Sequence, residues 1–526
     1  MMCIAFATPR GFFLPCLGQA AALRRDTKPL LDLLPLPCGS SLTFFRVSKV
    51  AVMIFSTFQF MFVFLPLVVC GFFLLCKHRL PRAAALWLLG ASLVYYGWWN
   101  PAYLLLIVCS LTGNYLLAAV MVSASGTLRR MLLAGGVAAN IGLLGYYKYT
   151  DFVIGSYNAL TGAAVPLQHI VLPLAISFFT FQQVAYLVDC HRGRAGTHGF
   201  VDYALFVCFF PQLIAGPIVH HAEMMPQFAS LRSRVVQWQN IYTGLFLFSL
   251  GLFKKVVLAD NLAVFAGYGF DSADTLSMGV AWGTSLAYTM QLYFDFSGYT
   301  DMALGASQML NIRLPDNFIS PYRAVNIQDF WRRWHITLSR WLRDYLYIPL
   351  GGSRRSESRT LVNLVFTFLL GGLWHGAGWT FVAWGAAHGA AMAVHRVWSA
   401  GGRRMPALAG WACTFLFVNL AWVLFRAESF ADALKVYEGM AGLHGFGMTR
   451  TFKDMFEAAT GVGPYGQLQF LLPACLAAFV FPNSRTLRGL VSPGMFWTAW
   501  IVICLFCSLY FMADAAHVSE FIYFRF

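Results

Sequence analysis

The side chain best suited to chemistry is His375, which lies inside an apolar segment, residues 361–394, whose composition suits a membrane interior. An ionisable group at bilayer depth is costly, so such groups usually line a cavity, pair internally or take part in chemistry. Nearby glycines allow the backbone to turn or to approach a neighbour closely; they are Gly371, Gly372, Gly376 and Gly378. The segment therefore predicts a functional site at His375. The alternative is a histidine that donates one hydrogen bond between packed helices.

A second histidine, His335, lies in a polar and aromatic stretch, residues 326–350. Apolar residues recur there at spacings of three and four, which predicts one amphipathic helix; they are Ile327, Phe330, Trp331, Trp334, Leu338, Trp341, Leu342 and Tyr345. The other face carries four arginines, and Asn326 with Asp329 resembles an N-terminal cap. Such a helix suits the membrane interface or the underside of a bundle. His335 falls near the apolar stripe, where a packed core histidine and a functional one would look the same.

Other charged residues follow apolar segments. Lys254 and Lys255 are interpreted as membrane-interface anchors, with donor-binding cations as the alternative. Asp295 and Asp301 are expected to pair with arginines just downstream or to cap a short helix, rather than to assist acid–base chemistry. Most of the 12 cysteines lie within apolar runs, so we expect no metal site.

The elements that position these residues belong to a membrane protein. Hydrophobic residues make up 59% of the 526 residues and charged residues only 11%, and apolar runs of about 20 residues recur along the chain. Long continuous runs favour helices over a β-barrel. The expected fold class is therefore an all-α polytopic membrane protein with about eleven transmembrane helices at about 20 residues a span.

The net charge of +15 is scattered over the loops between apolar runs. This pattern is typical of cytoplasmic loops that obey the positive-inside rule, with anionic lipid headgroups as partners and no nucleic acid. Lys77, Arg79 and Arg82 place the first loop in the cytoplasm, and Arg129 and Arg130 place the third loop there too. Basic loops could also attract an anionic donor such as a coenzyme A thioester.

Two regions depart from a simple series of spans. Residues 1–52 carry no apolar run long enough to cross a membrane, and Met53 begins a plausible first membrane segment, so we interpret them as an extension or a mis-assigned start before one membrane domain, residues 53–526. Residues 200–219 contain Pro211, Gly216 and Pro217, which predict a broken or re-entrant helix. Residues 426–466 read as a long polar connection.

Several long motifs resemble the membrane-bound O-acyltransferase superfamily, in its bacterial branch of alginate O-acetyltransferase membrane subunits. The resemblance spans residues 53–526 and rests on FWRRWHITLSRWLRDYLYIPLGGSR, LLGGLWHGAGWTFVAWG, FFPQLIAGPIV, LYFDFSGYTDMALG, NFISPYRA, WVLFRAESF and FIYFRF. The resemblance implies re-entrant and interfacial helices and a bundle around a central tunnel that holds the catalytic histidine. Residue by residue, it implies His375 as the histidine of its W-H-G motif and His335 as that of its W-R-R-W-H motif.

The chemistry that the resemblance implies is acyl transfer from a thioester to an oxygen nucleophile. His375 is then expected to act as general base and His335 to orient the donor. Trp334 and Trp374 would line the tunnel, with packing as their alternative role. No cofactor is expected to stay bound; acetyl-coenzyme A is the expected donor, and a serine-hydrolase-like periplasmic acetyltransferase is the expected partner at the inner membrane.

The acceptor and two other classes of function stay open. The motifs favour alginate, and cellulose, peptidoglycan and teichoic acid are alternatives. A transporter of an acyl carrier would be expected to show half-to-half repeats and more intramembrane carboxylates. A purely structural scaffold would leave both histidine motifs unexplained.

Overall fold

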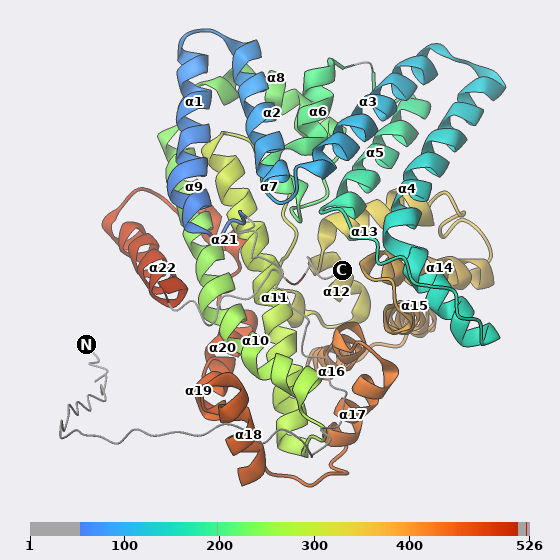
Figure 1. Cartoon of the computed structure of the whole chain (residues 1–526), viewed down its shortest axis with the longest axis vertical. Coiled ribbons are helices and arrows are strands. Elements are labelled where there is room, and N and C mark those ends of the chain that lie inside the picture. The colour runs from blue at the N-terminus through green and yellow to red at the C-terminus, as the bar shows by residue number, and fades with distance from the viewer. Residues whose placement is uncertain (1–52, 197, 514–521, 523–526) are drawn as a thin grey trace, which may run out of the picture. The chain divides into compact units, whose positions relative to one another are not determined.

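The computed structural model describes residues 53–196, 198–513 and 522, and its regular elements are helices throughout this part of the chain. The predicted extension, residues 1–52, lies outside the described residues. The first elements (Figure 1) are η1 (Phe60–Phe64), α1 (Leu65–Lys77), α2 (Pro81–Gly97), α3 (Ala102–Ser123), α4 (Gly126–Thr161), α5 (Ile176–His191), α6 (Phe200–Cys208), α7 (Phe210–Leu213), α8 (His221–Ala229) and η2 (Leu231–Arg234).

The central elements carry many of the buried polar residues. They are α9 (Trp238–Phe253), η3 (Lys254–Ala259), α10 (Asp260–Gly267), η4 (Tyr268–Ser272), α11 (Met278–Met309), η5 (Pro321–Arg323), α12 (Ile327–Arg333), α13 (Ile336–Leu342) and η6 (Arg343–Tyr347).

The C-terminal elements begin with the helix that ends at His375. They are α14 (Glu357–His375), α15 (Trp379–Ala400), α16 (Ala407–Arg426), α17 (Phe430–Met440), α18 (Arg450–Thr460), α19 (Pro464–Leu468), α20 (Leu471–Phe479), α21 (Ser484–Leu490) and α22 (Met495–Ala513).

Five helical stretches of the described chain are long and apolar enough to cross a membrane, and a sixth span forms if one bent pair is counted. The five are Phe60–Lys77, Ala102–Ser123, Trp238–Ser272, Ala407–Arg426 and Met495–Ala513, and the bent pair is Pro464–Phe479 with Ser484–Leu490. The polytopic all-α class is confirmed, whereas the count of about eleven stays a prediction.

The centre of the bundle is the crossing of α9 and α11. A β-carbon on Gly251 would lie 2.5 Å from the Gly298 carbonyl oxygen, and one on Gly305 would lie 2.6 Å from that of Gly244. The two backbones therefore touch without side chains between them, which is how small residues allow membrane helices to approach. Most of the 32 residues of α11 are buried as a result.

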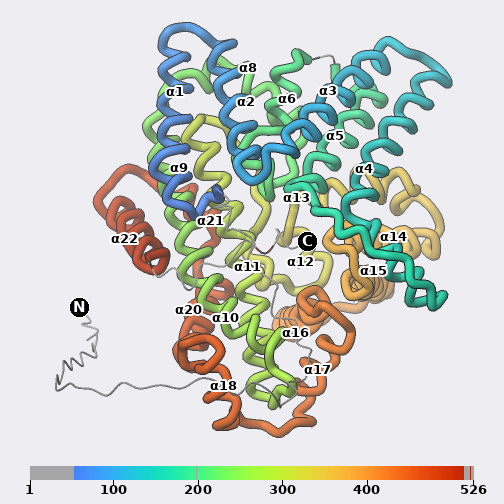
Figure 2. Tube along the Cα trace, in the orientation of Figure 1, coloured from blue at the N-terminus to red at the C-terminus, as the bar shows by residue number. Residues whose placement is uncertain are grey.

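A second close helix pair is formed by α14 and α15, whose traces run side by side (Figure 2). A β-carbon on Gly372 would lie 3.0 Å from the Gly385 α-carbon, and one on Gly389 would lie 2.8 Å from the Val365 α-carbon. A β-carbon on Gly376, just after α14, would overlap the Phe381 ring. Glycine thus fixes the separation of the two helices and the turn that follows His375.

Residues 326–350 do not form the single helix that their periodicity predicts. The stretch divides into α12, α13 and η6, and His335 lies in the first break with a φ of 42°. The loop after α11 provides hydrogen-bond partners for the backbone on both sides of this break. Ile336 N donates to Asn317 O at 3.0 Å, and Ile319 N donates to Arg333 O at 3.0 Å. The Asn326 cap is confirmed, since its side chain accepts from Asp329 N, whereas the reciprocal bond of a capping box is replaced by one from Val325 N to Asp329 Oδ2.

Two other expectations have different outcomes. The predicted break within residues 200–219 is confirmed, because α6 ends at Cys208 and α7 covers only Phe210–Leu213. The interpretation of residues 426–466 as a polar connection is wrong, because they form α17 and α18. Helix α17 packs against α11, where a β-carbon on Gly439 would lie 2.7 Å from the Ala281 side chain.

Candidate active site

His375 is the last residue of α14 and is 3% exposed. Its ring lies against aromatic rings, with centroid distances of 4.9 Å to Trp374 and 5.2 Å to both Trp384 and Phe425. The close packing of α14 on α15 holds the end of the helix in place. The imidazole is therefore held in a fixed, largely apolar environment.

His335 is fully buried and occupies the left-handed region of backbone space. Residues other than glycine rarely adopt that backbone conformation, and backbone strain of this kind is often found at functional sites. The imidazole Nδ1 lies 3.2 Å from Asn317 Oδ1, and the ring packs edge-on against Phe296 at 4.9 Å. The break between α12 and α13 thus turns the ring into the interior of the bundle.

The two histidines meet although they are 40 residues apart in the chain. Their ring centroids lie 6.3 Å apart, and Trp374 lies beside both, 6.2 Å from His335 and 4.9 Å from His375. Trp374 in turn stacks on Phe181 of α5 at 5.2 Å. The structure therefore brings together three of the four predicted site residues.

Trp334 lies in a different aromatic cluster. It is 1% exposed, and its ring centroid lies 5.0 Å from those of Phe318 and Trp422. The packing role that was the alternative for this side chain accounts for these contacts. Its predicted place on a tunnel wall stays a prediction.

Helix α4 caps the end of α14. Lys148 Nζ donates to the carbonyl oxygens of Trp374 at 2.5 Å and His375 at 3.2 Å, and the Tyr149 hydroxyl donates to Leu373 O at 2.8 Å. The last carbonyls of a helix have no intrahelical partner and carry the negative end of its dipole. A lysine is a favourable partner there, so Lys148 helps to hold His375 in position.

A third buried histidine, His388 on α15, was missed from the sequence although it lies in the same apolar segment as His375. Trp331 Nε1 donates to His388 Nδ1 at 3.2 Å. The His388 ring lies 4.7 Å from Trp384, which contacts His375. His388 lies four residues after Trp384, and this spacing on a helix could have indicated that the two side chains lie on the same face.

The buried lysines and aspartates form ion pairs with each other. Lys255 lies 2.7 Å from both Asp260 and Asp295, and Lys254 lies 2.6 Å from Asp301. The expectation that the two aspartates pair with downstream arginines is wrong, because η3 runs along α11 and places the lysines beside them. The interpretation of the lysines as interface anchors is wrong for the same reason.

A cavity of about 780 Å³ lies between α12, α13, α14 and α15. Its polar lining includes Arg332, Arg340, Arg343, His395 and Arg396, and its apolar lining includes Trp331, Ile336, Leu342, Phe368 and Met392. Arg340 pairs with Glu223, Arg343 with Asp344 and Arg396 with Glu357. The cavity reaches Ile336, the residue next to His335 in the chain, while the two histidines themselves are not part of its lining.

Part of the chain matches a known protein family. Residues 156–430, just over half of the chain, match the family described as the membrane-bound O-acyltransferase family. Both histidines and the cavity between α12 and α15 fall within the matched residues.

Similar proteins carry three different acceptor names. The chain is 45% identical to a peptidoglycan O-acetyltransferase of Helicobacter pylori over 91% of this chain and 99% of that protein. It is 43% identical to a probable alginate O-acetylase of Pseudomonas aeruginosa over 74% of this chain and 75% of that protein. It is 26% identical to a teichoic acid D-alanyltransferase of Bacillus subtilis over 50% of this chain and 71% of that protein.

Proposed function

Since the chain belongs to the membrane-bound O-acyltransferase family, we propose that it passes acetyl groups from a cytoplasmic coenzyme A thioester across the inner membrane for O-acetylation of a glycan. The chain is a multi-pass membrane O-acyltransferase. The observation that carries the finer proposal is the buried pair of His335 and His375, with ring centroids 6.3 Å apart. Neither an acyl-carrier transporter nor a scaffold needs such a pair.

His375 is the general base in this proposal. Its neutral imidazole takes the proton of the acceptor hydroxyl while the oxygen attacks the thioester carbonyl carbon. The intermediate collapses with cleavage of the carbon–sulfur bond, and the departing thiolate takes the proton back from the imidazolium. The aromatic rings around His375 exclude water, which protects the thioester from hydrolysis. His335 and Trp374 orient the donor beside it.

The donor binds in the cavity lined by Arg332, Arg340 and Arg343. A volume of about 780 Å³ is within the range of small-molecule sites, about 300–1,000 Å³. Arginine is well suited to the phosphates of coenzyme A, because its planar guanidinium forms paired hydrogen bonds with them. The apolar end of the cavity at Ile336 and Leu342 would accept the pantetheine arm and direct the thioester towards the histidines.

The final acceptor is a glycan outside the cytoplasm; the hydroxyl that attacks the thioester beside His375 is the first acceptor, from which a periplasmic partner passes the acetyl group on. Peptidoglycan is favoured, because the peptidoglycan O-acetyltransferase is 45% identical over nearly its whole length, whereas an alginate O-acetylase matched over its whole length is 37% identical. Alginate, which the sequence motifs favoured, is the second candidate, because the probable alginate O-acetylases share 37–43% identity over 75–100% of their own length. A serine-hydrolase-like periplasmic acetyltransferase is the proposed partner that completes the transfer.

The test compares cells that carry the unchanged protein or His375→Ala. Ester-linked acetate is measured separately in purified peptidoglycan and in secreted polysaccharide, and the amount of protein in membranes is measured in parallel. We expect His375→Ala to abolish the ester in one of the two glycans while the protein still accumulates. His444→Ala, which changes an exposed histidine, is the matched control and should leave the ester unchanged. Transfer that persists in His375→Ala would overturn the assignment of the base, and the glycan that loses its ester identifies the acceptor.

A further inference from the structure

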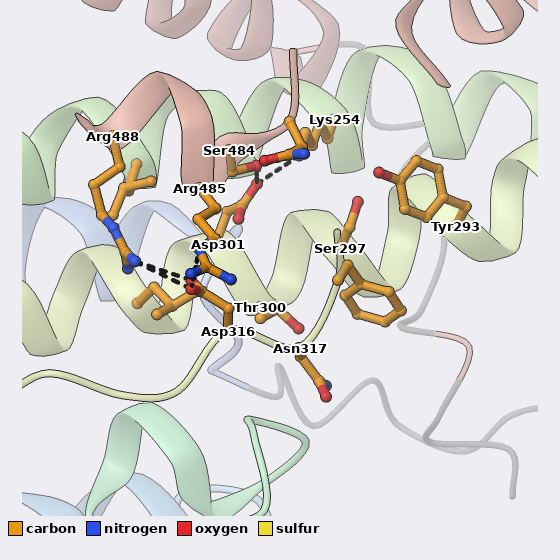
Figure 3. Close-up of a pocket in the computed structure, with 14 residues that line it drawn as sticks. Lys254, Tyr293, Ser297, Thr300, Asp301, Asp316, Asn317, Ser484, Arg485 and Arg488 are labelled. Carbon is orange, nitrogen blue, oxygen red and sulfur yellow. Dashed lines mark hydrogen bonds and ion pairs between the residues drawn. The ribbon is translucent and has the colours of Figure 1, made fainter. Parts of the chain in front are cut away.

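His388 of α15 is a buried titratable side chain that the proposed mechanism does not use. Charged side chains in the centre of the bundle pair with one another, as Figure 3 shows for Lys254 and Asp301. His388 is fully buried, and its partner is an aromatic side chain, because Trp331 Nε1 donates to His388 Nδ1 at 3.2 Å. This hydrogen bond joins α15 to α12.

The hydrogen bond fixes the protonation of His388. An indole N–H can only donate, so His388 Nδ1 must accept and carries no proton. A protonated imidazole has a proton on both ring nitrogens and would lose this bond. The imidazole is therefore neutral, with its proton on Nε2, and it serves as the acceptor for the Trp331 indole.

Trp331 belongs to the wall of the donor cavity. It lines the cavity together with Phe368, whose ring centroid lies 4.9 Å from that of Trp331. Arg332, the next residue of α12, lines the same cavity. Helix α12 thus contributes one aromatic and one cationic side chain to the place where the donor is proposed to bind.

Helix α12 is too short to hold these two side chains by its own hydrogen bonds. It has seven residues and ends two residues before His335, where the backbone breaks. Helix α15 is held more firmly, because β-carbons on Gly385 and Gly389 would lie 3.2 Å and 2.8 Å from α-carbons of α14. The bond from Trp331 to His388 therefore connects a short helical segment to a closely packed helix pair.

The ring of His388 has packing contacts as well. Its centroid lies 4.7 Å from that of Trp384, which contacts His375, and 5.1 Å from that of Phe417. A phenylalanine could keep contacts of this kind. Only a side chain with an acceptor at the place of Nδ1 could also hold the Trp331 indole.

We propose that His388 is a positioning residue for the donor, whose Nδ1 holds the Trp331 indole so that Trp331 and Arg332 keep their places in the cavity wall. This proposal rests on the proposed function, in which the cavity binds acetyl-coenzyme A. Without the acceptor, the indole N–H would be buried and unsatisfied, which is costly, so the ring should turn towards the cavity. The donor would then bind more weakly, while His375 would keep its surroundings.

His388→Phe and His388→Asn separate this role from simple packing. Phenylalanine keeps a ring but loses the acceptor, so we expect the KM for acetyl-coenzyme A to rise about tenfold with little change in kcat. Asparagine places Oδ1 where Nδ1 lies but removes most of the ring, so His388→Asn should be the less stable variant and yet have a KM within about threefold of normal.

A residue that only packs would give the opposite order, with the larger rise in KM in His388→Asn. That order would overturn the proposal, and so would a normal KM in folded His388→Phe. If His388→Phe does not accumulate, His388→Asn decides the question, because a tenfold rise in its KM would overturn the proposal by itself. Kinetics of the purified protein give both constants.

Trp331→Phe removes the donor of the same hydrogen bond. Adding His388→Phe to it should cause no further rise in KM, because the interaction is already lost. The double variant leaves no N–H without a partner at this place, so it should accumulate at least as well as His388→Phe. A further rise in KM in the double variant would overturn the proposal.

Arg332→Gln distinguishes failure of this proposal from failure of the proposed function. If Arg332→Gln and His388→Phe both leave the KM for acetyl-coenzyme A unchanged, the donor does not bind in this cavity, and the proposed donor site fails together with the role of His388. If Arg332→Gln raises the KM and His388→Phe does not, only the role of His388 is overturned.

Discussion

The two histidines differ in how they are held. His375 is held by its helix, whose end is capped by Lys148, whereas His335 is held by a strained backbone and by Asn317. A base must reach the reacting hydroxyl, and an orienting group must keep one tautomer. The proposed roles follow from this difference: His375 lies at the end of a helix, and His335 is held by its hydrogen bond to Asn317.

The arginine cavity leads to a prediction for donor affinity. Arg332 lines the cavity, and no acidic residue of the described chain pairs with it, unlike Arg340, Arg343 and Arg396. Arg332→Gln should therefore raise the KM for acetyl-coenzyme A about tenfold, which corresponds to ~1.4 kcal/mol, with little change in kcat. Kinetics of the purified protein measure both. Arg130→Gln, which removes an equal charge from an exposed position near the start of α4, should have a normal KM.

At the scale of elements, the pair α14 and α15 is a scaffold whose precision depends on glycine. The helices touch through their backbones at Gly372 and Gly385, so no side chain can adjust there. The break between α12 and α13 is the second element of the site, and the loop after α11 holds it open through backbone hydrogen bonds. Both elements place a histidine at the end of a helix segment rather than in its middle.

Gly385→Ala tests the scaffold. The new methyl group would overlap the Phe368 carbonyl and lie 3.2 Å from the Gly372 α-carbon, so α14 must shift and carry His375 with it. We expect a loss of stability of about 1–3 kcal/mol and a fall in activity of more than tenfold. Thermal unfolding in detergent and the acetyl-transfer rate give the two values. Gly113→Ala on α3 has open space at its β-carbon and should change neither.

At the scale of the whole molecule, buried ion pairs join η3 to α10 and α11 in the centre of the bundle. Lys255 of η3 is bonded to Asp295 of α11 and to Asp260 of α10. Lys254 reaches Asp301, whose carboxylate also accepts from Ser484 of α21 at 2.6 Å. Segments that are distant in the chain are thus connected by charge in a low-dielectric interior, where losing one partner is far more costly than at the surface.

Lys255→Met tests this connection. The change leaves Asp260 and Asp295 buried without their cation, and we expect a loss of about 3–5 kcal/mol of stability and little folded protein in membranes. Fluorescence-detected gel filtration of membrane extracts measures the folded fraction. Lys77→Met, at the exposed last residue of α1, should behave like the unchanged protein. Normal accumulation of Lys255→Met would mean that these aspartates are protonated or hydrated rather than paired.

Much of the architecture follows from the sequence alone. Long apolar runs predict a polytopic helical protein because unsatisfied backbone groups are so costly in lipid that few other structures can span a membrane. Proline and glycine predict the break after α6, and Asn326 predicts the start of α12, because these signals act within a few residues. His375, His335 and Trp374 could be singled out because two motifs carry them.

Only the tertiary structure decided how distant residues meet. The periodicity of residues 326–350 predicts one helix, and contacts with the loop after α11 break it at His335. The partners of Asp295 and Asp301 are lysines from a helix that lies earlier in the chain, and Asn317, Lys148 and His388 gain their places beside the site only through packing. Local signals set the helices, because their hydrogen bonds join near neighbours in the chain. The site is built from contacts between residues far apart, which the sequence does not encode at any fixed spacing.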